Sequence, residues 1–195
     1  MNDLTPFGDL LEAARDGHGQ AFTQLWQRYS RGVAAFARSR GAEEPDELTS
    51  DVFVAVFRSL GEFVGDETAF RGFLFTVARR RLVDDVRRRR RRPLTSPWDS
   101  RADQRRAASA EEVVMGLGSE SRARDLLAGL TPDQRDVLVL RIFGELPLEQ
   151  VAAILGKRQG AVKALQHRAL ATLRRTVFDS TDDHTDDHDQ ERGRP

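Results

Sequence analysis

The stretch from Phe70 to Pro93, FRGFLFTVARRRLVDDVRRRRRRP, most constrains how this chain of 195 residues can fold. Apolar residues recur in its first half at helical spacing, which predicts one buried helix face. The second half carries nine arginines and two aspartates between Arg79 and Arg92, a formal charge of +7. We expect a helix that is rooted in a small helical domain and whose far end meets a polyanion. DNA is the first candidate because arginine neutralises phosphates. The stretch alone leaves a solvated, arginine-rich helix end as the alternative.

Charge is segregated along the chain, although its 31 basic and 31 acidic residues cancel. The segment from Asp179 to Glu191 holds seven acids and no Lys or Arg. The absence of cysteine excludes disulfides and thiolate metal sites. The first residues, MNDLTPFGDLLEAARDG, lack the basic start and apolar run of a signal peptide, and no window approaches the ~20 apolar residues of a membrane span. We therefore expect a cytoplasmic protein without membrane insertion.

Helical periodicity runs through nearly the whole chain, and Pro and Gly are sparse inside the periodic segments. An all-α fold of two small helical domains joined by a flexible linker is the prediction. Residues 1–93 form the first domain, with helices expected over about 9–15, 20–40 and 45–60 before the basic helix. Residues 94–120, rich in Pro, Ser, Gly and charge, form the linker, with a short helical piece near 110–115. Residues 121–178 form the second domain, and 179–195 form a disordered acidic tail.

A helix-turn-helix pattern lies in the second domain. Thr131-Pro132 opens one helix, Gly144 ends it, and Pro147 opens a short helix that ends at Gly156. Ala152, Gly156 and Val162 supply the small residue, the glycine turn and the aliphatic anchor that such a motif needs.

An ordinary αα-hairpin with a polar outer face fits these three residue types as well. The polar and basic side chains Lys163, Gln166 and Arg168 on the second helix favour DNA binding, because the start of that helix enters the major groove.

In its basic segment and its helix-turn-helix pattern, the chain resembles the sigma-70 family of bacterial RNA polymerase specificity subunits, in particular its small extracytoplasmic-function (ECF) group. The segment EEPDELTSDVFVAVFRSL is similar to the part that docks on the clamp helices of the β′ subunit. FRGFLFTVARRRLVDDVRRRRRR is similar to the part that melts and reads the −10 element. LTPDQRDVLVLRIFGELPLEQVAAILGKRQGAVKALQHRALATLRR is similar to the fourth region, which reads the −35 element and contacts the β flap.

The resemblance implies a transcription initiation factor that binds core RNA polymerase and promoter DNA, and that an anti-sigma protein restrains. Contacts at the −10 element are expected from Phe63, Phe70, Phe73, Arg79, Arg80, Arg81, Asp84, Arg87 and Arg88. Contacts at the −35 element are expected from Arg158, Gln159, Gly160, Lys163, Gln166, His167 and Arg168. Docking on the polymerase is expected from Asp46, Glu47, Leu48, Asp51, Phe53, Val137 and Leu138.

The chain departs from the family pattern at several of these places. Arg80 stands where an asparagine is usual beside a flipped −10 base, and Ala164-Leu165 replaces a Ser-Arg pair in the recognition helix. These changes bear on which bases the protein prefers.

Three other classes of function explain less of the sequence. A helix-turn-helix regulator that binds operators without polymerase explains the second domain, but it leaves Phe70–Pro93 unexplained. A protein-interaction module leaves the arginines unexplained. No paired carboxylates in an apolar setting, Ser/His/Asp arrangement or phosphate loop indicates an enzyme, and no cofactor is expected. His184 and His188 lie in the acidic tail without a third fixed ligand, so no metal site is expected either.

Overall fold

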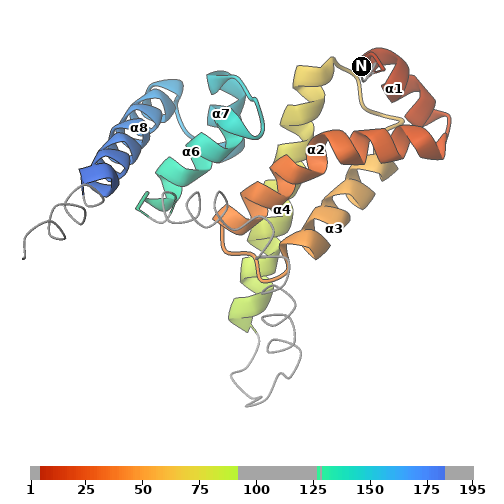
Figure 1. The fold of residues 1–195 in the computed structure, drawn as a ribbon. Helices are drawn as coiled ribbons and strands as arrows, with labels where there is room; N and C mark the ends of the chain where they lie inside the picture. Colours follow the sequence, from red (N-terminus) through yellow and green to blue (C-terminus); the bar gives the residue numbers. More distant parts are fainter. Residues whose placement is uncertain (1–4, 92–126, 128, 183–195) are drawn as a thin grey trace, which may run out of the picture.

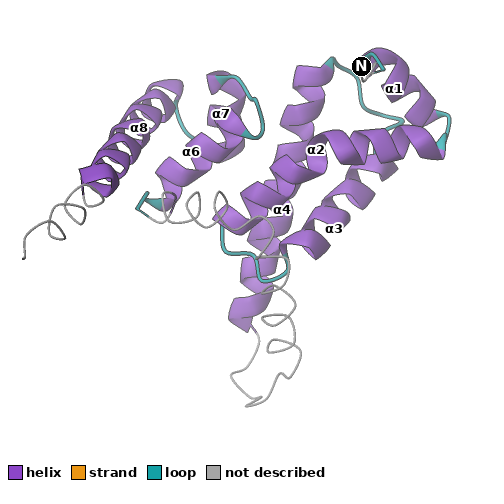
Figure 2. Ribbon diagram, viewed as in Figure 1, coloured by secondary structure: helices purple, strands orange, loops and turns teal. Residues whose placement is uncertain are grey.

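The computed structural model describes residues 5–91, 127 and 129–182, and within these it contains helices and loops (Figures 1 and 2). The elements in chain order are α1 (Phe7–Arg15), α2 (Gly19–Ser39), α3 (Pro45–Arg58), α4 (Glu67–Arg91), α6 (Pro132–Ile142), α7 (Leu148–Leu155) and α8 (Gln159–Asp182). The predicted all-α fold with an N-terminal and a C-terminal helical unit is confirmed. The predicted linker, 94–120, and its short helical piece lie outside the described residues.

Helices α1 to α4 form the N-terminal unit around an apolar core. Spacing of three and four residues places large side chains on the inner face of each helix. The side chains that are fully buried include Leu25, Val33 and Phe36 of α2, Val52, Phe53 and Val56 of α3, and Phe70, Leu74 and Phe75 of α4. Burying a side chain of this size stabilises the fold by about 1.5–3 kcal/mol. The core therefore fixes the direction in which the basic end of α4 leaves the unit.

Helices α6 to α8 form the C-terminal unit, and local signals set their ends. Thr131 caps α6 in a capping box: its hydroxyl accepts from the backbone N–H of Gln134, and the Gln134 side chain accepts from the backbone N–H of Thr131. Helix α8 packs on α6 through a small apolar cluster that contains Leu130, Leu138 and Ala169. The predicted start at Thr131-Pro132 matches the structure.

The two units pack directly against each other. Helix α6 lies against α2, and α7 lies against α4 (Figure 1). One apolar cluster runs through both units: it joins Phe36 and Phe75 of the N-terminal unit to Val139, Leu140 and Leu155 of the C-terminal unit. The described part of the protein is therefore one body with a shared core.

Two predicted boundaries differ from the structure. Helix α8 continues to Asp182, so the prediction of disorder from residue 179 is wrong for its first four residues. Once a helix is nucleated, each added residue contributes one hydrogen bond for the two dihedral angles that it fixes, so a helix can extend past its last apolar position. Helix α4 begins at Glu67, before the first apolar residue of its periodic pattern, and the Asp66 side chain accepts from the backbone N–H of Ala69 in its first turn.

Within the described residues, no helix combines the length and apolarity needed to cross a bilayer. The same residues contain no group of His, Cys, Asp or Glu side chains arranged to hold a metal ion.

Candidate nucleic-acid interface

The turn between α7 and α8 has the geometry of a helix-turn-helix. Gly156 follows α7 in the left-handed conformation at φ 64°, and no other atom lies within 4 Å of where its Cβ would be. Glycine is therefore needed here for its backbone conformation, not for space. Ala152 and Val162, the other two positions of the motif, are buried as predicted.

The first turns of α8 expose a polar face. Gln159, Lys163, His167 and Arg168 are exposed and Gln166 is half-buried, whereas the opposite face is buried through Val162 and Ala169. Arg158 and Gly160 are exposed at the same end. All seven residues predicted to contact the −35 element therefore lie at the start of one helix.

Three cations of this face, Arg158, Lys163 and Arg168, have no acidic partner among the described residues, and Arg168 donates only to the carbonyl oxygen of Ala164 in its own helix. Lys157, by contrast, is paired with Asp133 at 2.8 Å (Nζ–Oδ2). The start of α8 thus offers free cations next to backbone N–H groups at a helix N-terminus, an arrangement that suits phosphate.

The basic end of α4 forms a second candidate surface. Arg80, Arg81, Asp84, Arg87 and Arg88 are exposed there, and Arg88 pairs with Asp85 at 3.0 Å (Nη2–Oδ1). The side chains beyond Arg88 in this helix are outside the described part of the structure. The exposed arginines lie on the half of α4 that projects away from the core in Figure 1.

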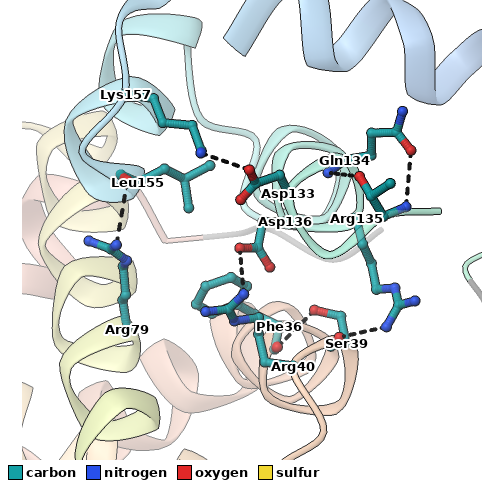
Figure 3. Close-up of polar contacts among 11 residues, drawn as sticks. Phe36, Ser39, Arg40, Arg79, Asp133, Gln134, Arg135, Asp136, Leu155 and Lys157 are labelled. Atoms are coloured by element: carbon teal, nitrogen blue, oxygen red, sulfur yellow. Dashed lines mark hydrogen bonds and ion pairs between the residues drawn. The ribbon is translucent and has the colours of Figure 1, made fainter. Parts of the chain in front are cut away.

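Arg79 differs from its neighbours because it is half-buried at the contact between the two units. Its Nη2 donates to the carbonyl oxygen of Leu155 at the end of α7, at 3.4 Å (Figure 3). A cation at this place also complements the partial negative charge of a helix C-terminus. In this conformation the Arg79 guanidinium is engaged in a hydrogen bond within the protein.

Three phenylalanines predicted at the −10 site form one aromatic cluster, but they differ in burial. Phe63 and Phe73 are half-buried and stack, with ring centroids 5.7 Å apart. Phe70 is fully buried and contacts the rings of Phe7, Tyr29 and Phe63. Only Phe63 and Phe73 present part of their rings to solvent, so in this conformation Phe70 acts as a core residue and leaves the candidate surface.

Tyr29 contacts this cluster through Phe70 and is hydrogen-bonded to Glu67. The Tyr29 hydroxyl donates to Glu67 at 3.0 Å, and Arg28 pairs with the same carboxylate at 3.0 Å. Burial raises the pKa of Tyr29, and the negative charge of Glu67 raises it further. Tyr29 therefore stays protonated and holds the start of α4 in place.

The residues predicted to dock on polymerase also divide by burial. Asp46, Glu47 and Asp51 are exposed on α3. Leu48 and Phe53 of α3 are buried in the core of the N-terminal unit, and Val137 and Leu138 of α6 are buried in the apolar clusters of the C-terminal unit and its contacts. The structure keeps these four apolar side chains inside because they stand on the inward faces of their helices, so only the acidic residues of the predicted set form a surface here.

Two exposed apolar side chains that the sequence analysis missed lie on the same pair of helices, α2 and α3. Trp26 of α2 and Val54 of α3 are 36% and 47% exposed, and the Trp26 ring lies 4.8 Å from that of Phe53. Val54 falls between the inward positions of α3, and an apolar residue off the periodic face is the signal that indicates such a surface.

A pairing between the units was also missed. Arg40, directly after α2, forms an ion pair with Asp136 of α6, with Nη1 and Oδ2 3.1 Å apart, and Arg135 donates to the carbonyl oxygen of Ser39 at 3.1 Å (Figure 3). The sequence signal for such a contact is glycine inside a helix, at Gly32 and Gly72, where a partner can approach the backbone closely.

Comparisons with known proteins agree with this geometry. Residues 25–92 match the family model "Sigma-70 region 2", and residues 126–175 match "Sigma-70, region 4". The ECF RNA polymerase sigma factor ShbA of Streptomyces griseus is 31% identical over 183 residues, covering 89% of this chain and 96% of ShbA. The ECF RNA polymerase sigma factor BldN of Streptomyces coelicolor is 30% identical over 180 residues, covering 91% of this chain and 68% of BldN.

A solved structure of CnrH in complex with the cytosolic domain of CnrY is also similar. It has a TM-score of 0.58 and 28% identity, and the match covers 88% of this chain and 96% of that one. Both sigma regions occur in the expected order on one chain, which disfavours a simple operator-binding regulator. The chain therefore belongs to the ECF group of the sigma-70 family, the transcription initiation factors that direct RNA polymerase to promoters.

Proposed function

We propose that the start of α8 reads the −35 element of the promoter. The observation that carries this assignment is the exposed polar face of α8 directly after the left-handed turn at Gly156, with Val162 buried behind it. Lys163 and Arg168 project from the exposed side of the helix and Gln166 from its half-buried edge, and their amide and cationic groups match the acceptors and donors of major-groove base edges.

The exposed half of α4 is proposed to hold the −10 region. Arg80, Arg81, Arg87 and Arg88 neutralise phosphates of the separated strand, which supplies sequence-independent affinity. The half-buried rings of Phe63 and Phe73 offer a stacking surface, and stacking contributes about 1–3 kcal/mol per base. Because unpairing a base step costs a similar amount, the surface favours separated strands once polymerase holds the DNA.

Docking on the clamp helices of the β′ subunit is assigned to the outer face of α2 and α3. Glu47, Asp51 and Val54 recur at helical spacing on the exposed side of α3, Asp46 is exposed at the start of the same helix, and the exposed Trp26 of α2 packs on Phe53. Apolar anchors with a charged rim are typical of protein interfaces.

Contact with the β flap of polymerase is assigned to the C-terminal end of α6. Ile142 and Phe143 are exposed there, at 58% and 52%. Val137 and Leu138 of the same helix, which were predicted to dock on the polymerase, are buried.

No bond chemistry is assigned to the protein, and it acts where polymerase and DNA are, in the cytoplasm. Since CnrH was solved with the cytosolic domain of CnrY, we extend the proposal to a protein inhibitor of that kind for this chain. Such a partner would compete with polymerase for exposed apolar residues of the two units.

Core-dependent run-off transcription tests the assignment of α8. Lys163→Ala, Gln166→Ala and Arg168→Ala should each relax the preference between promoters that differ in one −35 base pair, by about 1–3 kcal/mol for a lost base contact. Arg174→Ala, an exposed arginine farther along α8, is the matched control. If the three variants reduce transcription equally from all promoters, whatever their −35 sequence, α8 contacts only phosphates and the assignment fails.

A further inference from the structure

The charges of α8 and of the residues that follow it are separated into two blocks. Residues 157–178 include six basic residues and no acidic one. Residues 179–191 include seven acidic residues and no Lys or Arg. The acidic block can lie along the basic one only if the chain reverses direction after α8.

This order of charges works against the intrinsic stability of α8. A helix favours acids at its start and bases at its end, because the aligned peptide dipoles leave partial positive charge at the start and partial negative charge at the end. Helix α8 has no acidic residue in its first turn and no basic residue in its last turn. Instead, Lys163 lies near its start, and Asp179 and Asp182 lie in its last turn. The stability of the helix therefore does not explain where these charges are placed.

The exposed side of α8 is basic and lacks acidic partners. Arg158, Lys163, Arg168, Arg174 and Arg175 are all exposed, and none of them pairs with a carboxylate of the described residues. The opposite side of the helix packs on α6 and α7. The exposed side, called the basic side of α8 below, is therefore open to an anionic partner.

Residues 183–191, called the acidic segment below, are long enough to reach much of this side. Arg168 lies about 21 Å from the end of α8 at 1.5 Å per residue, and Lys163 lies about 28 Å from it. The acidic segment spans at most about 30 Å when it is extended. After a reversing turn its carboxylates therefore reach Arg174, Arg175 and Arg168, whereas Lys163 lies at the limit.

The basic end of α4 suits the acidic segment less well. Helix α8 packs on α6 and α7, and it ends on the side of the molecule away from α4 (Figure 1). Arg88 of α4 already shares its charge with Asp85. The cations nearest to the acidic segment are therefore those of α8 itself.

A covalently attached segment needs little intrinsic affinity to occupy the basic side. A short connection gives such a segment an effective concentration in the millimolar range. Exposed ion pairs are individually weak and are screened by salt. Duplex DNA carries one negative charge per about 1.7 Å, whereas the acidic segment has five acids over about 30 Å. DNA that binds well at α8 therefore displaces the segment.

We propose that the acidic segment folds back along α8 and covers Arg168, Arg174 and Arg175 when DNA is absent. It then competes with every duplex for the basic side, so complexes with non-promoter DNA, which are weak already, are lost first. The contact itself rests on charge and reach. Its competition with DNA rests in addition on the proposed function of α8.

Paramagnetic relaxation in NMR spectra of the full chain tests the contact without DNA. The chain has no cysteine, so a spin label at Gln190→Cys reports the place of the acidic segment without removing a charge. At low salt the amide signals around Arg168 should broaden, and added salt should remove the broadening. The neutral-segment variant, which combines Asp186→Asn, Asp187→Asn and Asp189→Asn, should remove it as well. Broadening that is confined to the end of α8, or that persists in this variant, overturns the contact.

Fluorescence anisotropy with a mixed-sequence duplex of about 20 base pairs, two helical turns, tests the competition. At low salt the neutral-segment variant should bind this duplex several-fold more tightly than wild type. The matched control combines Asp9→Asn, Glu12→Gln and Asp16→Asn, which removes the same charge from exposed positions in and directly after α1. Its affinity should stay close to that of wild type, with circular dichroism confirming its helix content. An equal gain in both variants would mean that net charge alone is responsible, and would overturn the competition.

Arg168→Ala separates the failure of this inference from that of the proposed function. The gain on neutralising the segment should shrink in the Arg168→Ala background, because residues in contact do not act additively. If Arg168→Ala relaxes the −35 preference in run-off transcription but the neutral-segment variant binds duplex like wild type, the function of α8 stands and the competition is overturned. If neither substitution changes DNA binding while the spin label still broadens the signals around Arg168, the contact stands and the assignment of DNA to α8 fails.

Discussion

Arg40, the residue directly after α2, and Asp136 of α6 form an ion pair with Nη1 and Oδ2 3.1 Å apart and the carboxylate almost wholly buried. Burial is the main reason that the pKa of Asp136 is raised from 3.8 to about 6, and the positive charge of Arg40 opposes this rise. Asp133 on α6 raises the pKa as well, while Arg79 and Arg135 lower it. Lys157 faces the same group of charges through its pair with Asp133.

Stability should therefore depend on pH through Asp136. Because its folded pKa lies above its unfolded value, the folded state binds more protons between about pH 4 and 6. This contribution is fully present below about pH 4 and is lost as the pH rises through about 6. The rise of the Asp136 pKa from 3.8 to about 6 corresponds to on the order of 3 kcal/mol of unfolding free energy.

Urea unfolding of wild type and Asp136→Asn between pH 4 and 7.5 isolates the contribution, since other carboxylates titrate in both proteins. The stability of the Asn variant relative to wild type should increase as the pH rises across this window. Parallel pH profiles would show that Asp136 is not the group responsible.

The ends of several helices could be predicted from the sequence because capping and turn residues act locally. Pro45, the Thr131-Pro132 pair and Gly156 act within a few residues of themselves, so the starts of α3 and α6 and the end of α7 are predicted correctly. The expected small and aliphatic positions of the helix-turn-helix follow from the same short-range rules.

Contacts between distant segments could not be predicted in the same way. Phe70 and Phe73 are one helical turn apart and read alike in the sequence, but Phe70 faces Phe7 and Tyr29 and is fully buried. Likewise, a helical glycine such as Gly32 indicates that a partner can approach α2, but it does not identify Arg40 and Asp136 as a pair, because the pairing depends on how the two units dock. Residue type is local information, whereas burial is decided by the tertiary fold.

The capping box of α6 should contribute measurably to stability. Thr131→Ala removes the hydroxyl that accepts from the Gln134 backbone at 3.4 Å, so we expect a loss of about 0.5–1 kcal/mol, at the lower end for such caps because this bond is long. Thr131→Ser keeps the hydroxyl and should lose much less. Equal losses from Ala and Ser in thermal unfolding would contradict the assigned cap.

Two glycines on either side of the helix-turn-helix turn should respond oppositely to alanine. Gly156→Ala forces a side chain into the left-handed region at φ 64° and should destabilise the protein by about 1–2 kcal/mol. Gly160 lies inside α8 with no atom within 4 Å of its Cβ, so Gly160→Ala should be neutral or stabilising by up to about 1 kcal/mol. Urea unfolding measures the stability of both variants. A loss of stability in Gly160→Ala would show that helix propensity does not determine the effect of alanine at this position.

Phe70 should behave as a core residue. Phe70→Ala removes a fully buried ring and should cost about 3–5 kcal/mol of unfolding free energy, whereas Phe70→Leu keeps most of the apolar volume and costs less. Promoter melting per folded molecule should survive in Phe70→Leu but fall in Phe73→Leu, because Phe73 retains an exposed edge. If Phe70→Leu abolishes melting at wild-type stability, Phe70 reaches the DNA through a rearrangement of α4.

The arginines at the exposed end of α4 should determine the salt dependence of promoter binding. Each cation that meets a phosphate releases condensed counterions, so its removal lowers the slope of log affinity against log salt by about 1. Arg87→Ala and Arg88→Ala should each weaken binding of the polymerase complex to all promoters alike, with the larger effect at Arg87 because Arg88 shares its charge with Asp85. Arg31→Ala removes an equal charge from an exposed position on α2 and should leave the slope unchanged. An unaltered slope in both α4 variants would mean that these arginines are solvated and that the phosphates are held elsewhere.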